Sequence, residues 1–66
     1  MQVTINGRSC EVPDDLTVQA LVAHLGLTEG PVAVEINQEI VTRARHGDCH
    51  VHAGDVVEIV HFVGGG

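Results

Sequence analysis

Residues 56–62 constrain the fold most, because apolar side chains occupy odd and even positions of this segment alike. A strand that is apolar on both sides usually lies in the middle of a sheet. The chain has 66 residues and can therefore form only one compact unit. Its core must consist of Val, Ile, Leu and Ala, since the sequence holds a single Phe and neither Tyr nor Trp. We expect a small domain built around a central strand at residues 56–62.

The first residues predict a β-hairpin. Apolar and polar side chains alternate over residues 2–5, as they do on a half-buried strand. Asn6-Gly7 suits a type I′ turn, because both central residues of that turn need positive φ angles. The alternation continues over residues 10–12, which are expected to form the returning strand.

A short amphipathic helix is predicted after the hairpin. Its apolar stripe consists of Val18, Leu21, Val22 and Leu25. Thr17 is placed to cap the first turn, and Gly26 to end the helix in the left-handed conformation. A helix of about two turns with one apolar face is not stable alone. It must lie across one face of the sheet.

The second half of the chain predicts two more strands. Residues 31–37 alternate, with Val32, Val34 and Ile36 expected to face inward. Asn37-Gln38 then turns into a short apolar pair, Ile40 and Val41. Residues 42–52 are expected to be mostly loop, anchored by Val51. A turn at residues 53–55 leads into the final strand.

The final strand should present different side chains to the two faces of the sheet. Val57 and Ile59 fall on one face and Val56, Val60 and Phe62 on the other. We expect the first set to face the helix, although alternation alone does not determine which set is inside. One helix covers one face only, so the second set would form an exposed apolar patch, of the kind that often marks a docking site for a partner. The alternative is that residues 42–52 cover it.

Charge excludes one class of partner. The formal net charge is -6, with three Arg and no Lys, so the basic surface that nucleic acids require is absent. An acidic chain is instead steered towards proteins with basic docking surfaces. No apolar run approaches membrane-spanning length, and no secretion signal is present, so a cytoplasmic location is expected.

The cysteines and histidines do not predict a metal site. Cys49 and the histidines at positions 46, 50 and 52 are close in sequence, but they match no ligand spacing of a zinc site. We expect Cys10 to be a buried small hydrophobe and both cysteines to be reduced.

The glycine run Gly64-Gly65-Gly66 follows the last strand directly. Glycine lacks a Cβ, so such a run can thread a narrow channel, and its terminal carbonyl carbon is sterically open to attack. The α-carboxylate of Gly66 is therefore a candidate functional group that suits acyl activation. A frayed, inert chain end is the alternative.

Together these features resemble the ThiS family of sulfur carriers in thiamine biosynthesis. The segments that carry the resemblance are the Asn-Gly hairpin, the capped helix, residues 32–41 and residues 54–66. The resemblance implies an α+β, ubiquitin-like β-grasp fold, with a mixed sheet of four to five strands and one helix across one face. The first and last strands would lie side by side and parallel. Residues 1–63 would form the domain and residues 64–66 a flexible tail.

The resemblance also implies a function that is not enzymatic. An activating enzyme would use ATP and magnesium to adenylate Gly66, and a persulfide donor, such as a cysteine desulfurase, would supply sulfur to form a thiocarboxylate. Thiazole synthase would take this sulfur to build the thiazole moiety of thiamine. Gly64 and Gly65 would let the tail enter both active sites. No catalytic residue, bound cofactor or bound metal is implied for the chain itself.

Three alternatives stay open at this point. The small subunit of molybdopterin synthase and ubiquitin-like protein modifiers share the fold and a diglycine end, and a binding module with an inert tail belongs to another class. Many ThiS relatives carry Pro at the position of Thr42 and an aromatic residue shortly after the position of Arg43. This chain has neither. The short chain and the lead into the tail, residues 60–63, favour the thiamine carrier.

Overall fold

A five-stranded mixed sheet with strand order β2-β1-β5-β3-β4 forms the body of the protein, of which the structure, a computed structural model, describes residues 1–62. The strands are β1 (Gln2–Ile5), β2 (Arg8–Glu11), β3 (Val32–Ile36), β4 (Glu39–Val41) and β5 (Val56–His61). β5 pairs in parallel with β1 and antiparallel with β3. The predicted central position of the last strand is thus confirmed, as is its parallel pairing with the first.

Both hairpins turn through residues with positive φ angles. In the β1–β2 turn, φ is 51° at Asn6 and 84° at Gly7, as the type I′ prediction requires. The β3–β4 turn repeats this pattern at Asn37, where φ is 51°, and at Gln38, where φ is 71°. Asparagine tolerates this region better than most residues do. The second turn makes a fifth strand, β4, out of the predicted apolar pair.

Helix α1 (Val18–His24) begins and ends as its sequence predicts. The hydroxyl oxygen of Thr17 accepts a hydrogen bond from the N–H of Ala20 at 3.1 Å. At the other end, φ of Gly26 is 76°, and the N–H of Leu27 donates to the carbonyl oxygen of Val22 at 3.1 Å. This pattern is a Schellman motif, which satisfies carbonyl groups at the end of the helix.

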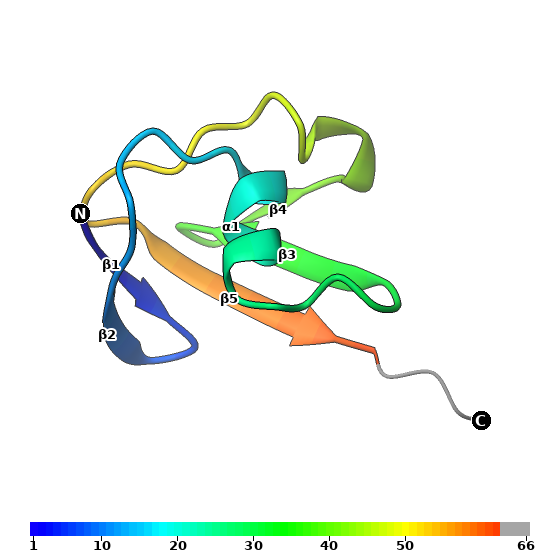
Figure 1. Ribbon diagram of the computed structural model, residues 1–66, viewed down its shortest axis with the longest axis horizontal. Coiled ribbons are helices and arrows are strands. Elements are labelled where there is room, and N and C mark those ends of the chain that lie inside the picture. The colour runs from blue at the N-terminus through cyan, green and yellow to red at the C-terminus, as the bar shows by residue number, and fades with distance from the viewer. Residues whose placement is uncertain (63–66) are drawn as a thin grey trace.

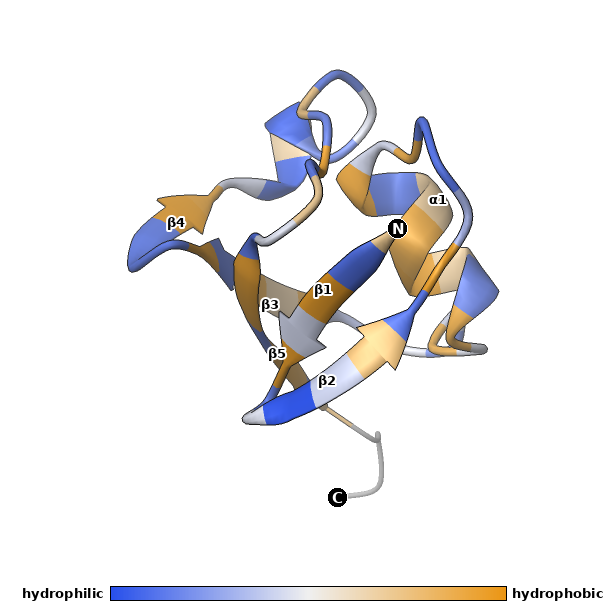
Figure 2. Cartoon of the chain, turned by 90° about the vertical axis from the view of Figure 1, so that its left-hand side faces the viewer, coloured by the Kyte–Doolittle hydropathy of each residue, from blue (hydrophilic) through white to orange (hydrophobic). Residues whose placement is uncertain are grey.

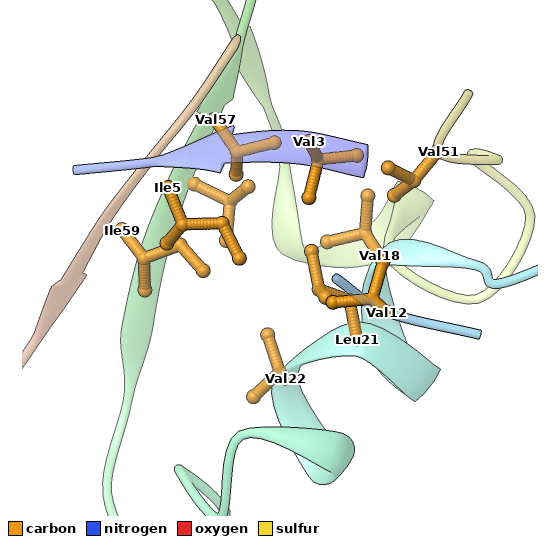
Figure 3. Packing of buried hydrophobic residues seen from close by; sticks show 10 residues of the cluster. Val3, Ile5, Val12, Val18, Leu21, Val22, Val51, Val57 and Ile59 are labelled. Carbon is orange, nitrogen blue, oxygen red and sulfur yellow. The ribbon is translucent and has the colours of Figure 1, made fainter. Parts of the chain in front are cut away.

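The helix lies across one face of the sheet (Figure 1). Between the two lies a core of aliphatic side chains only, and in Figure 3 those of the sheet and those of α1 point toward one another. The core consists of Val3, Ile5, Val12, Val18, Leu21, Val22, Val34, Val51, Val57 and Ile59. Figure 2 shows the matching alternation of hydrophobic and hydrophilic residues along β1.

The segment that joins β4 to β5 packs on the helix side of the molecule. It contains a short 3-10 helix, η1 (Arg43–Arg45), and is otherwise irregular. The backbone N–H of Val18 donates to the carbonyl oxygen of Cys49 at 2.8 Å, and Val51 is buried in the core, as predicted. This segment therefore closes the helix layer and does not cover the opposite face of the sheet, so that alternative is wrong.

Candidate functional site

β5 divides its apolar side chains between the two faces of the sheet. Val57 and Ile59 face the helix and are 0% and 6% exposed. Val56, Val60 and Phe62 are 45%, 54% and 53% exposed. The predicted assignment of faces is therefore confirmed.

Ile40 joins this exposed surface, and the sequence analysis missed it. Residue 40 is opposite Glu35 across the β3–β4 ladder, and Glu35 is opposite Glu58 across the β3–β5 ladder. Side chains opposite one another lie on the same face, so Ile40, 76% exposed, shares the face of Val60. We call Ile40, Val56, Val60 and Phe62 the outer patch. The signal was available in the hairpin register that Asn37-Gln38 sets.

Two carboxylates lie within the outer patch. Glu35 and Glu58 are exposed and directly opposite each other, an arrangement that slightly destabilises a sheet. The arginines lie elsewhere: Arg8 is on an edge strand, opposite the inward-facing Ile5, and the other two are in η1. The face that carries the patch is thus apolar and acidic.

Two asparagine side chains hold β5 in place. The side-chain amide of Asn6 donates to the carbonyl oxygen of Ile59 at 3.0 Å and accepts from the N–H of Ile59 at 2.8 Å. Asn37 accepts from the N–H of Val56 at 3.0 Å and donates to a carboxylate oxygen of Asp55 at 3.1 Å. Both turn residues thus brace the strand that carries the patch and leads to the tail.

The cysteines and histidines named above do not converge on one point. Cys49, His50 and His52 line a cleft of about 490 Å³ beside the β3–β4 hairpin, whereas the ring of His46 points to the carbonyl oxygen of Val41 at 3.1 Å. Within residues 1–62, no three side chains of His, Cys, Asp or Glu are grouped so that they could hold a metal ion. Cys10 lies on β2 and packs against the core, as expected of a small hydrophobe, but it is half-buried and not fully buried.

The predicted sulfur-carrying residue Gly66 and its neighbours Gly64 and Gly65 lie outside the described residues, as does Val63. The last described residue is Phe62, which comes directly after β5 and lies at the end of the molecule opposite to the N-terminus (Figure 1). The candidate site is therefore the outer patch together with the sequence that follows it.

Comparison with protein families decides between the carriers that the sequence left open. The model of the ThiS family matches residues 3–66, which is nearly the whole chain and includes the glycine run. The chain belongs to the ThiS family. The matched segment is thus a ThiS-type sulfur carrier domain.

The relatives that match this chain include a sulfur carrier protein and two thiazole synthases. The sulfur carrier protein ThiS of Bacillus subtilis is 41% identical over 63 residues, covering 94% of this chain and 96% of the relative. Thiazole synthases of Paramagnetospirillum magneticum and Magnetococcus marinus are 42% and 35% identical over all 66 residues. The chain spans 20% of the length of each of these two proteins.

A solved structure confirms the fold. The crystal structure of ThiS from Geobacter metallireducens superposes with a TM-score of 0.84 at 35% identity, and each chain is covered completely. The five-stranded sheet with one helix is therefore the β-grasp fold that the resemblance implied. None of the helices within residues 1–62 has the length and apolar character to cross a membrane.

Proposed function

We propose that the α-carboxylate of Gly66 is the group that carries sulfur. The observation that supports this most directly is the family match, which extends through Gly66 on a chain whose fold is that of ThiS. The glycine run adds steric access, because no side chain shields the terminal carbonyl carbon.

The chemistry requires activation of this carboxylate by a separate enzyme. A carboxylate is a poor electrophile, because its charge is delocalised over both oxygens and neither oxygen is a good leaving group. Attack of a carboxylate oxygen on the α-phosphorus of ATP, with magnesium held by the activating enzyme, expels pyrophosphate and forms an acyl adenylate. A persulfide then attacks the acyl carbon and expels AMP. Cleavage of the resulting acyl disulfide by a thiol releases the thiocarboxylate.

The outer patch is the docking surface in this proposal. Val56, Val60 and Phe62 lie on or directly after the strand that leads to the tail, and about half of each side chain is accessible. Clustered apolar side chains of this kind are typical of interface centres. Gly64 and Gly65 then span the distance between the docked domain and the reacting atoms inside the partner.

Two partners act on the tail in turn. The first is the activating enzyme, supplied with sulfur by a persulfide donor, and the second is thiazole synthase, which takes the sulfur from the thiocarboxylate. The two thiazole synthases that contain a segment similar to this whole chain support the second partnership. Joining a carrier to its acceptor in one polypeptide raises the effective concentration of one for the other.

Mass spectrometry tests the proposal directly. The protein is incubated with its activating enzyme, ATP, magnesium and a persulfide donor, and the C-terminal peptide is analysed. We expect the chain to end at Gly66 and this peptide to gain the mass difference of one sulfur replacing one oxygen. A reaction without ATP is the control and should leave the mass unchanged. Sulfur on any other peptide, or none on this one, would refute the proposal.

A further inference from the structure

The connection between α1 and β3 runs beside the end of β5 (Figure 1). The N–H of Phe62 donates to the carbonyl oxygen of Pro31 at 3.0 Å. The Nε2 atom of His61 makes a second hydrogen bond, to the carbonyl oxygen of Glu29. We call residues 29–31 the clasp. It holds the last two described residues of the chain from one side.

Gly30 allows the clasp to lie this close. Its φ angle is 83°, in the left-handed region that side chains other than glycine rarely adopt. A methyl group added at residue 30 would lie 2.6 Å from the carbonyl oxygen of Phe62, which is closer than a Cβ approaches another heavy atom. An alanine at this position must therefore push the backbone of Phe62 away or open the clasp.

The position of Phe62 matters because, in the proposed function, only residues 63–66 connect it to the reacting carboxylate. Residues 63–66 can span at most roughly 14 Å when fully extended. The reacting atoms must come within about 3–3.5 Å of each other, and a misplacement of about 1 Å can reduce the rate by about a hundredfold. Because glycine has no side chain, residues 64–66 cannot fix the direction of the tail by side-chain contacts of their own. The folded domain must therefore set the position and direction of the backbone at Phe62, where the tail begins.

We propose that Gly30 is a positioning residue for activation of the carrier, acting through the backbone of Phe62. This inference rests on the proposed function. It adds to that function a residue of the connection between α1 and β3, which contacts the backbone of Phe62 and does not itself belong to the outer patch. Gly30 does not touch the reacting carboxylate. It sets the point and direction at which the tail leaves the domain, so that a docked carrier presents Gly66 to ATP.

The test compares two alanine variants with the same backbone penalty. In Gly26→Ala the substituted residue also has a positive φ, 76°, but an added methyl group would have nothing within 4 Å. Adenylation kinetics are measured with the activating enzyme as a function of carrier concentration. For Gly30→Ala we expect kcat to fall about tenfold or more while KM stays within about twofold, because only Phe62 of the outer patch is displaced and the rest of the patch still docks. Gly26→Ala should keep both constants near those of the parent.

Amide hydrogen exchange, followed by NMR, checks the clasp without any partner. The N–H of Phe62 should lose protection in Gly30→Ala, whereas the N–H of Ile59, which is bonded to Asn6, should not. Loss of protection at Phe62 with an unchanged kcat would overturn the inference and leave the proposed function intact. So would a rise in KM alone, or an equal fall in kcat in Gly26→Ala. A parent protein that is not adenylated at all refutes the proposed function, and the inference with it.

A second variant keeps the inference testable if Gly30→Ala does not fold. His61→Ala removes the hydrogen bond to Glu29 and leaves every φ angle compatible with its residue. We expect the same pattern with a smaller size, a fall in kcat of about threefold to tenfold at constant KM. Constants equal to those of the parent, in a folded variant with an unprotected Phe62 amide, would overturn the inference.

Discussion

The two faces of β5 carry the same kind of side chain for opposite purposes. Val57 and Val60 are both valines of β5, yet the first residue is 0% exposed and the second 54% exposed. Burying a valine side chain contributes about 1.5–3 kcal/mol to folding. Val57 contributes this energy within the domain. Val60 stays about half exposed, so a large part of this free energy is not gained on folding and is available for contact with a partner.

The same difference extends across the sheet. The inner face joins the core through side chains from β1, β3, β5 and α1, whereas the outer face presents Ile40 and Val60 beside two opposed carboxylates, Glu35 and Glu58. Neither an apolar patch in water nor a pair of like charges stabilises the isolated domain. The inner face is thus built for folding. The outer face is better explained by docking.

The largest effect is expected when a charge is placed on the inner face. Val57→Asp would bury a carboxylate without a partner in an aliphatic core, at a cost comparable with the whole stability of a domain this small. We expect no cooperative thermal transition by circular dichroism. Val60→Asp is the matched control and should melt within a few degrees of the parent. Equal melting temperatures for the two variants would show that the faces are not divided as described.

Removal of Gly65 and Gly66 should eliminate function and spare the fold. The two residues have no side chains to bury, so the free energy of unfolding should change by less than about 0.5 kcal/mol. Adenylation should be lost, because the terminal carboxylate no longer reaches the activating enzyme. Pyrophosphate release measures activation, and thermal melting measures stability. A large fall in melting temperature would mean that the tail belongs to the folded domain.

Val60→Asp sharpens the comparison from the other side. A charge at the centre of the outer patch should weaken binding to the activating enzyme by about 2 kcal/mol, which corresponds to roughly thirtyfold in Kd. Isothermal titration calorimetry with the enzyme measures this change. Ser9→Asp is the control, since it adds the same charge on the same face but on the edge strand β2. If Ser9→Asp weakens binding equally, total charge and not the patch is responsible.

Local rules predicted much of this molecule. The Asn-Gly turn, the Thr17 cap and the Gly26 end of the helix depend on residues a few positions apart, and all three are found in the structure. Alternation along residues 56–62 also separated the apolar side chains of β5 into two sets correctly, but it did not determine which set faces the helix; the structure buries Val57 and Ile59. Each of these features is determined by short-range sterics and hydrogen bonding.

Long-range contacts set the limit of prediction. The hairpin register places Ile40 opposite Glu35, but its place beside Val60 also depends on the long-range pairing of β3 with β5. The same holds for Gly30, whose partner Phe62 is far along the chain and appears only when the clasp meets β5. The packing of residues 42–52 on the helix side also follows from hydrogen bonds to α1, which composition alone does not indicate.

The smallest effect is expected for the cysteines. If the tail alone carries sulfur, the double variant Cys10→Ser, Cys49→Ser should still gain sulfur at Gly66 at a rate close to that of the parent. Both thiols are free and half-buried, and that of Cys10 lies 3.5 Å from the carbonyl oxygen of Arg8, so a serine hydroxyl there has an acceptor at hand. The loss of stability should therefore stay below about 2 kcal/mol.

The readout is again the mass of the C-terminal peptide, with each single variant melted in parallel to locate any loss of stability. Pyrophosphate release separates activation from sulfur transfer. A folded double variant that is adenylated like the parent but gains no sulfur would show that a thiol of this chain takes part in transfer. The division proposed here, in which the inner face folds the domain, the outer face docks it and only the tail reacts, would then be wrong in its last part.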